Sequence, residues 1–598
     1  MTSTNMMCRP AGLDDVLPVT FGKSFGWLHP GRCDTGVIIC HATGWDAHGS
    51  YGAFRRMAAE LASLGYPTLR FDYPGVGDAL ELDGDEPCAA WLDSVGRACD
   101  HMRATRVKHI VLCGHRVGAL LAAFVAVRRD DVSGLILVDP VALGTLYLRE
   151  LALEQTLTSD APGPEDGRIE AEGIVLTSAS AAPFRALSLL SLQRIPASRI
   201  LILASQKRPA NAKIADRLAS LGAEVEQDAI EPMREFSTNG LIDPKPPLDR
   251  IHRWLGPATP SSFSPAHPPS CAVELNGGAG FTEHPIRFGA GQRLFGMLCR
   301  PRSETLPGFV LVIGTAGGTC HHGNARFTVL LARRLAEAGY ASLRMDYAGI
   351  GESVSDQPTH VYATDRRTDV AEAIEALQLE GFSRFGAGGL CSGAFHSLQA
   401  SLADRRIETL VMLNPSTFSW SKDQDFAKFI QSSTRSTGFY METMMGRKGW
   451  KRLLRGELDV FKAIRTVWSH MARRLRALGS HAAERAGWQG PGATPRQAMA
   501  RVSARGVRTL VVIGTIDAGA DVLKAHFGSG GHWLAALPGT TLRLTLRVDH
   551  ALTRVFMQEA IAATLIDFLR ARLDSTKPDL SKGRVLPTAG LPGDRAAA

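Results

Sequence analysis

The sequence predicts an α/β protein made of two copies of one fold, each a mainly parallel, doubly wound sheet. Three observations support this prediction. The chain has 598 residues, and single hydrophobic cores stop growing near about 250 to 300 residues. Short apolar runs alternate with amphipathic helical stretches, which is typical of βαβ units. Finally, several segments recur later in the chain with a similar amino-acid sequence.

Four landmarks recur at a nearly constant spacing, which indicates a tandem duplication. They are FGKSFGWLHP at 21–30 with FGAGQRLFGMLCRP at 288–301, LGYPTLRFDYPGVGDA at 64–79 with AGYASLRMDYAGIGES at 338–353 (offset 274), Arg116 in CGHRVGAL with Cys391 in GGLCSGAF (offset 275), and Asp139 in LVDP with Asn414 in MLNP (offset 275).

The elements follow in the same order in both copies: a strand with a Gly-rich loop, a helix, then a second strand. We expect these at 36–44, 54–66 and 67–75 in the first copy, and at 309–318, 327–340 and 341–349 in the second. Such runs form mainly parallel sheets, whose sites lie at the carboxyl ends of the strands.

Composition places the chain among ordinary globular proteins, with 45% hydrophobic and 21% charged residues. No leader-like segment opens the sequence and no apolar run is long enough for a membrane span, so we expect a cytoplasmic protein. Ten cysteines without a CxxC pair predict reduced thiols and neither a metal nor a cofactor. The net charge is 67 minus 59, or +8, and residues 421–476 alone carry 13 minus 5.

GGLCSGAF and CGHRVGAL both stand where a strand turns into a helix. Glycines two positions before and after the central residue permit the tight turn of a nucleophile elbow. In the second copy these are Gly389 and Gly393, which places Cys391 at the tip. Ser392 is a rival nucleophile, but its flanking residues would be Leu390 and Ala394, and leucine does not fit that turn.

A thiol at an elbow needs a base and a group that orients the base. Asp517 follows the strand RTLVVIG, and His550 follows TTLRLTLRV. The order nucleophile, acid, histidine is that of the α/β-hydrolases. We therefore predict Cys391 as nucleophile, His550 as general base and acid, and Asp517 as the orienting carboxylate, with Asp521 as the alternative acid.

A hydrolase site also needs donors for the oxyanion. We expect one from the N–H of Ser392 and the second from the loop 314–318, at Thr315 or Ala316.

The first copy lacks this chemistry, because Arg116 replaces the nucleophile. The region of the first copy that corresponds to Asp517 offers Gln206 but no carboxylate. The region that corresponds to His550 contains no histidine. A guanidinium stays protonated and can hold a carboxylate or phosphate. Two interpretations of Arg116 therefore stay open, an anion-binding residue and a structural arginine paired with an internal acid.

The predicted organisation has a degenerate domain at 1–256, a Pro/Ser-rich linker at 257–279, a catalytic domain at 280–576 and a disordered tail at 577–598. A cap at about 415–505 contains a basic amphipathic helix near 460–476. That helix either packs on the domain or attracts an anionic acyl donor or carrier, an acidic sugar polymer, or a membrane face. Nucleic acid is not expected, nor is stable membrane insertion, and the oligomeric state stays open.

The second copy resembles the exosortase A system-associated hydrolase 1 family, in the elbow GLC, the strand LVVIGTID and the pair Asp549–His550. The first copy is similar to the hydrolase 2 family, whose elbow also carries arginine, as in GHRVG. The resemblance covers roughly residues 18–256 and 280–572. It implies a tandem α/β-hydrolase fold and an association with exopolysaccharide gene clusters.

Together these observations predict a hydrolase that cleaves an ester or thioester of a small-molecule or carrier-bound acyl substrate through a cysteinyl acyl-enzyme. An acyltransferase using the same intermediate is the first alternative. A non-catalytic binding or assembly protein, in which both sites have lapsed, is the second.

Overall fold

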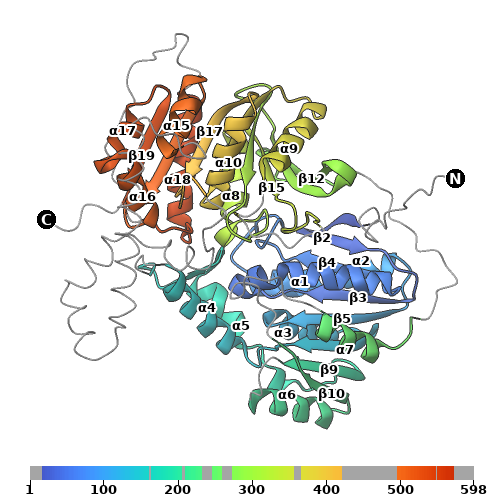
Figure 1. Cartoon of the computed structure of the whole chain (residues 1–598). Helices are drawn as coiled ribbons and strands as arrows, with labels where there is room; N and C mark the ends of the chain where they lie inside the picture. Colours follow the sequence, from blue (N-terminus) through green and yellow to red (C-terminus); the bar gives the residue numbers. More distant parts are fainter. Residues whose placement is uncertain are drawn as a thin grey trace, which may run out of the picture. The chain divides into compact units, whose positions relative to one another are not determined.

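The structure is a computed structural model that describes residues 16–159, 163–204, 209–231, 245–258, 273–355, 362, 365–420, 494–546 and 548–571. Gln206, most of the predicted linker, residues 421–493 of the predicted cap and the C-terminal tail lie outside the described residues. The chain divides into two compact units, one formed chiefly by residues up to Gly278 and the other chiefly from Ile286 onward (Figure 1).

The first unit contains an eight-stranded sheet in the order β1-β2-β4-β3-β5-β6-β9-β10. Strands β1 and β2 pair antiparallel, β2 pairs antiparallel with β4, and every later pair is parallel. The strands of this unit are β1 (Leu17–Phe21), β2 (Ser24–His29), β3 (Thr35–Cys40), β4 (Thr68–Asp72), β5 (His109–His115), β6 (Val132–Val138), β7 (Ile169–Ala171), β8 (Ile174–Leu176), β9 (Arg199–Ala204) and β10 (Glu224–Ala229). The helices are α1 (Gly44–Ser63), α2 (Pro87–Ala104), α3 (Val117–Ala126), α4 (Gly144–Thr158), α5 (Ser178–Arg185), α6 (Pro209–Ser220) and α7 (Lys245–Leu255).

The second unit repeats this sheet with one more strand, in the order β11-β12-β13-β15-β14-β16-β17-β18-β19. Its strands are β11 (Leu275–Asn276), β12 (Phe281–Phe288), β13 (Leu294–Pro301), β14 (Phe309–Gly314), β15 (Ala341–Asp346), β16 (Arg384–Leu390), β17 (Ile407–Leu413), β18 (Arg508–Gly514) and β19 (Thr540–Thr545). Its helices are α8 (Phe327–Glu337), α9 (Arg367–Leu379), α10 (Ser392–Ala403), α15 (Pro495–Ala504), α16 (Ala518–Phe527), α17 (His532–Ala535) and α18 (Val555–Arg570).

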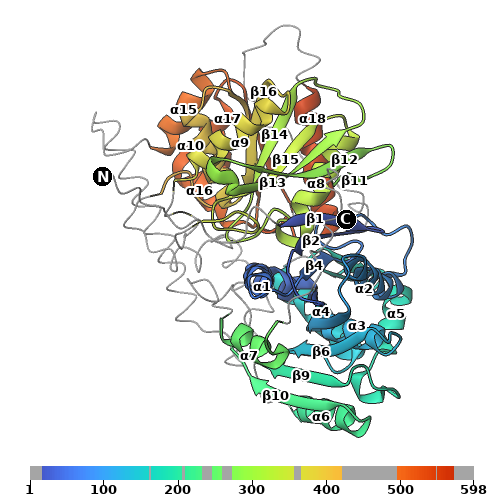
Figure 2. The same ribbon diagram turned by 90° about the vertical axis from the view of Figure 1, so that its right-hand side faces the viewer.

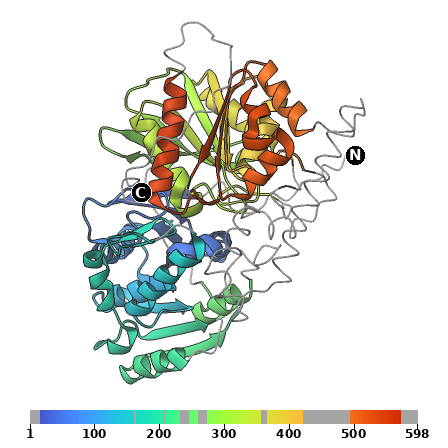
Figure 3. The ribbon, with the colours of Figure 1, turned by 90° about the vertical axis from the view of Figure 1, so that its left-hand side faces the viewer.

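Both faces of each sheet are buried, as expected for parallel sheets with helices on either side. In β3, Ile38 packs with α2 and α3, whereas Val37 and Ile39 pack with α1 and α7. In the second unit α8 and α18 cover one face, and α9, α10, α15 and α16 cover the other (Figure 2). Helix α18, drawn in red, runs alongside the sheet of its unit in Figure 3. The predicted fold class, two tandem mainly parallel α/β sheets, is confirmed.

Helix α1 begins earlier than predicted. The hydrophobic pattern indicates a helix from residue 54, but the structure begins α1 at Gly44. The first turns bury Asp46, Gly49 and Ser50, which are small or polar. A pattern of apolar residues therefore misses this part of the helix.

The C-terminal end of the predicted cap range forms helix α15, which packs with the helices that cover the sheet. Helix α15 begins with a capping box, in which Thr494 Oγ1 accepts from the Gln497 N–H and the Gln497 side chain accepts from the Thr494 N–H. Its Met499 and Val502 are buried in the same cluster as residues of α10 and α16.

Among the described residues, no helix combines the length and the apolar character that a bilayer crossing requires.

The turn between β16 and α10 yields a stability prediction. A Cβ on Gly393 would lie 2.4 Å from the Gly314 carbonyl oxygen, too close without a backbone shift. We expect Gly393→Ala to lower the free energy of unfolding by about 1–3 kcal/mol, measured by urea denaturation.

Gly318→Ala is the matched control, because nothing lies within 4 Å of a Cβ there. We expect its effect to stay within about 0.5 kcal/mol. Equal effects of the two substitutions would contradict this account of the turn.

Candidate active site

Cys391 lies at a strained turn between β16 and α10. Its φ of 53° and ψ of −111° are unusual for a residue with a side chain. Gly389 and Gly393 make the turn possible, because a Cβ on either would approach the Gly314 carbonyl oxygen, to 2.6 and 2.4 Å. The strand end and the helix start are thereby pressed against the loop after β14, and the Cys391 side chain is left partly exposed.

The first unit forms the same turn at Arg116, with a φ of 53° and a ψ of −117°. The hydrogen bonds also correspond: the Arg116 N–H donates to the Val138 carbonyl at 3.0 Å, and the Cys391 N–H donates to the Leu413 carbonyl at 2.9 Å. The two copies therefore share the elbow down to its backbone bonds and differ in the side chain presented there.

Ser392 does not compete with Cys391 for the tip of the turn. It is the first residue of α10 and is fully buried. Its Oγ accepts a hydrogen bond of 2.7 Å from the Gly317 N–H. This bond fixes the hydroxyl as part of the contact between helix and loop.

His550 and Asp517 meet beside the elbow. His550 Nδ1 lies 2.5 Å from Asp517 Oδ2, and the Asp517 side chain is fully buried. Asp517 is also the N-cap of α16, where its Oδ1 accepts from the Gly519 N–H at 2.6 Å. Both carboxylate oxygens are thus engaged, which fixes the orientation of the acid and leaves Nε2 of His550 to act. The structure places Asp517, rather than the alternative Asp521, against the imidazole.

Asn414 holds the loop that carries His550. Its Nδ2 donates to the carbonyls of Asp549 at 3.0 Å and His550 at 3.2 Å. Its Oδ1 accepts from the Gly514 N–H at 2.8 Å, at the end of β18. One buried side chain therefore ties the histidine loop to the strand that leads to the acid.

The thiol and imidazole shift each other's pKa. Burial by itself raises the pKa of Cys391, but the charge and hydrogen bonding of His550 outweigh it and the pKa is lowered. Burial by itself lowers the pKa of His550, but the Asp517 carboxylate and the Cys391 thiolate hold it well above its usual value. These opposite shifts favour a thiolate–imidazolium pair.

Two further hydroxyl groups face the sulfur. Ser416 Oγ lies 3.2 Å and Tyr362 OH 3.9 Å from Cys391 Sγ, and both lower the pKa of the thiol further. Tyr362 stacks on Trp420, with ring centroids 4.6 Å apart, and contacts Phe395. An aromatic wall therefore stands beside the nucleophile.

The predicted oxyanion donors lie against the elbow. Thr315 and Ala316 follow β14, and the Gly317 N–H next to them bonds to Ser392. Among the described residues no hydrogen-bond acceptor is found for the backbone N–H groups of Ser392, Thr315 or Ala316. The N–H of Ser392 opens a helix, where the first donors have no partner within the helix.

Arg116 is engaged inside its own unit. Its Nε lies 2.9 Å from Asp46 Oδ2, its Nη2 2.6 Å from Glu150 Oε2, and its Nη1 donates to the Asp139 carbonyl at 3.2 Å. Two carboxylates against one guanidinium repel a further anion. These contacts favour the second interpretation, a structural arginine paired with internal acids, over an anion-binding residue.

The sequence interpretation missed Asn414, Ser416 and Tyr362 as parts of the site. Asn414 had a signal, because it matches Asp139 in the repeat and directly follows a strand. Ser416 stands two residues beyond it. Tyr362 had none, since nothing in its local sequence relates it to the elbow.

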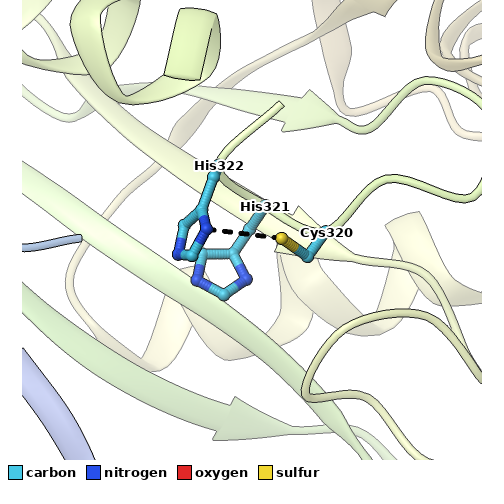
Figure 4. A group of neighbouring side chains, drawn as sticks. All are labelled: Cys320, His321 and His322. Atoms are coloured by element: carbon cyan, nitrogen blue, oxygen red, sulfur yellow. Dashed lines mark hydrogen bonds between the residues drawn. The ribbon is translucent and has the colours of Figure 1, made fainter. Parts of the chain in front are cut away.

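One cluster has the chemistry of metal ligands. Donor atoms of Cys320, His321 and His322 lie within 4.8 Å of one another (Figure 4). The sequence analysis expected no metal because it looked for the usual spacings between cysteine and histidine ligands. Cys320, His321 and His322 are consecutive and match none of those spacings.

No protein-family model matches the sequence. A Mycoplasma pneumoniae protein named "Putative esterase/lipase 2" is 26% identical over 142 residues, 24% of this chain. The match spans 51% of that protein, so the chain covers about half the length of this relative.

Solved structures of similar fold include Est1E from Butyrivibrio proteoclasticus with bound ferulic acid, at 16% identity and a TM-score of 0.30 over 39% of this chain and 94% of that one. An esterase of Pyrococcus furiosus is 11% identical, with a TM-score of 0.30, and the match covers 49% of this chain and 92% of that one. An α/β-hydrolase of Penicillium is 15% identical, with a TM-score of 0.30, and the match covers 41% of this chain and 95% of that one. The fold of both units, judged from sheet order and elbow, is that of the α/β-hydrolases.

The pKa shifts predict how Cys391 reacts with pH. The thiolate fraction rises with pH through the lowered pKa, so alkylation by iodoacetamide should reach its midpoint below that of an ordinary thiol. In His550→Ala the imidazolium is lost while burial remains, so the midpoint should move to higher pH. Mass spectrometry of the adduct measures both profiles, with Cys391→Ala as the unreactive control, and an unchanged midpoint in His550→Ala would oppose this account.

Asn414 provides a separate prediction. Asn414→Leu removes the bonds to the histidine loop, and displacing a catalytic group by about 1 Å costs about 10²-fold in rate. We expect alkylation of Cys391 by iodoacetamide near neutral pH to slow by up to about that factor, and its midpoint to move toward that of His550→Ala. Asn276→Leu, at an exposed position of β11, is the control. A rate loss without a shift in midpoint would indicate a different role for Asn414.

Proposed function

We propose that the second unit cleaves an ester or thioester through a covalent cysteinyl acyl-enzyme. The observation that carries the proposal is the partly exposed Cys391 thiol at an elbow, with its pKa lowered by a His550 that is itself oriented by buried Asp517. The α/β-hydrolase fold and the esterase/lipase description of the Mycoplasma relative support the substrate class.

In the proposed first step the Cys391 thiolate attacks the carbonyl carbon. The carbonyl electron pair moves to oxygen, and the resulting oxyanion is bound by the N–H of Ser392 with that of Ala316 or Thr315. The tetrahedral intermediate collapses, the bond to the leaving alkoxide or thiolate breaks, and the His550 imidazolium gives it a proton. The acyl group is then held as a thioester on Cys391.

In the second step neutral His550 accepts a proton from water, and the oxygen of that water attacks the thioester carbonyl. The carbon–sulfur bond breaks, the acid is released and the thiolate–imidazolium pair is restored. Asp517 keeps the imidazole in the required tautomer and stabilises its charge in both steps.

Acyl transfer to a hydroxyl group is the second candidate. The wall of Tyr362, Phe395 and Trp420 beside Cys391 favours it, because a dry surface disfavours attack by water. The thioester retains its transfer potential until an acceptor arrives. An acceptor alcohol that raises turnover and diverts product from free acid to a new ester would identify the transferase.

The resemblance of the two copies to exosortase A system-associated hydrolases supports an acceptor or substrate within exopolysaccharide synthesis. The positive charge concentrated at 421–476 supports an anionic acyl donor. A cytoplasmic location is part of the same proposal.

The test is the intact mass of the protein after brief exposure to p-nitrophenyl butyrate. We expect a butyryl increment that maps to Cys391 and is absent in Cys391→Ala. Asp517→Asn should form it about 10³-fold or more slowly, because the imidazole loses its orienting charge. Cys299→Ala is the control, since this buried cysteine lies on β13, and it should acylate normally.

Absence of any Cys391-dependent increment from folded protein, over several acyl chain lengths, would overturn the proposal. A non-catalytic binding protein would then be the better interpretation.

A further inference from the structure

The loop between β14 and α8 gathers three consecutive side chains with metal-binding donors. Cys320 Sγ lies 3.4 Å from His322 Nδ1, and the rings of His321 and His322 have centroids 4.5 Å apart. One donor atom from each of Cys320, His321 and His322 falls within a 4.8 Å group (Figure 4). The proposed hydrolytic steps use none of these side chains.

The separation of sulfur and nitrogen fits a tetrahedral ion. Zinc binds thiolate sulfur at about 2.3 Å and imidazole nitrogen at about 2.0–2.1 Å. At a tetrahedral angle those two ligand atoms stand about 3.5 Å apart. The 3.4 Å between Cys320 Sγ and His322 Nδ1 is therefore close to the ligand spacing of a zinc site.

A buried carboxylate already orients one of the imidazoles. His321 Nδ1 lies 2.7 Å from Asp346 Oδ2, and the His321 backbone N–H donates to Asp346 Oδ1 at 2.6 Å, with both side chains fully buried. Asp346 also accepts from the Glu352 N–H at 2.8 Å. Histidines that ligate metals usually make such a bond with the nitrogen that does not bind the ion, which directs the other nitrogen to it.

The backbone of the loop is held in place as well. The Gly323 N–H donates to the Cys320 carbonyl at 2.9 Å, and Thr328 Oγ1 donates to the His321 carbonyl at 2.5 Å. The donors are therefore presented by a turn that is fixed at both ends, which lowers the cost of bringing them around one ion.

We propose that Cys320, His321 and His322 form a zinc site, with His321 binding through Nε2 and Asp346 as its orienting carboxylate. One thiolate and two imidazoles suit Zn²⁺. On binding, the Cys320 thiol releases its proton to solvent, and the fourth position is left for water or another ligand. Because Thr315 and Ala316 lie on the same loop, bound zinc would also brace the predicted oxyanion donors.

The test uses the full chain in a Cys391→Ala background, because Cys391 and His550 themselves offer a thiol and an imidazole. Metal-free protein is titrated with Zn²⁺ against a chromophoric chelator, and separately with Co²⁺. We expect one equivalent to bind, and the cobalt form to show thiolate-to-metal charge transfer and the strong visible bands of a tetrahedral ion.

Cys320→Ser and His322→Gln, each in the same background, should weaken zinc binding by about tenfold or more and abolish or shift the cobalt bands. Cys299→Ser should leave both unchanged. Circular dichroism of the metal-free variants establishes that they fold. No zinc uptake by the Cys391→Ala protein, or equal affinity in folded Cys320→Ser and His322→Gln variants, would overturn the proposal.

Discussion

The site depends on one backbone constraint, the positive φ of Cys391, the residue between β16 and α10. It persists because Gly389 and Gly393 allow the turn to press against the Gly314 carbonyl. Strain of this kind is retained where the surrounding structure determines it. The same contact aims the Cys391 side chain outward, places the first N–H groups of α10 beside it, and brings the loop after β14 within hydrogen-bonding distance of Ser392.

The charged groups around the elbow differ between the two units. In the second unit the buried Asp517 carboxylate helps to raise the pKa of His550, and His550 in turn lowers the pKa of Cys391. In the first unit the same turn carries Arg116, whose charge is neutralised by Asp46 and Glu150. The duplicated backbone thus presents a thiol whose pKa is lowered by an imidazole in one copy, and a guanidinium paired with two carboxylates in the other.

Asp139, directly after β6, and Asn414, directly after β17, show one difference between the two copies. Asp139 and Asn414 both have positive φ and both donate their N–H to the next strand, at 2.7 and 2.8 Å. Only Asn414 also spans to the histidine loop, because an amide can donate to carbonyls and accept from an N–H at once. A carboxylate cannot donate in that way, which suits a copy with no histidine to hold.

The sequence by itself determined the duplication, the α/β class, the elbow glycines and the order of cysteine, aspartate and histidine, because these are local patterns or spacings along the chain. It predicted Asp517 but left Asp521 open, and it left two interpretations of Arg116. Only the tertiary structure decided the carboxylate that meets His550, the pairing of Arg116 and the roles of Tyr362, Ser416 and Asn414. Such contacts join residues far apart in sequence, so their geometry is set by the packing of strands and loops. The convergence of Cys320, His321 and His322 likewise depends on how their turn is held by Asp346.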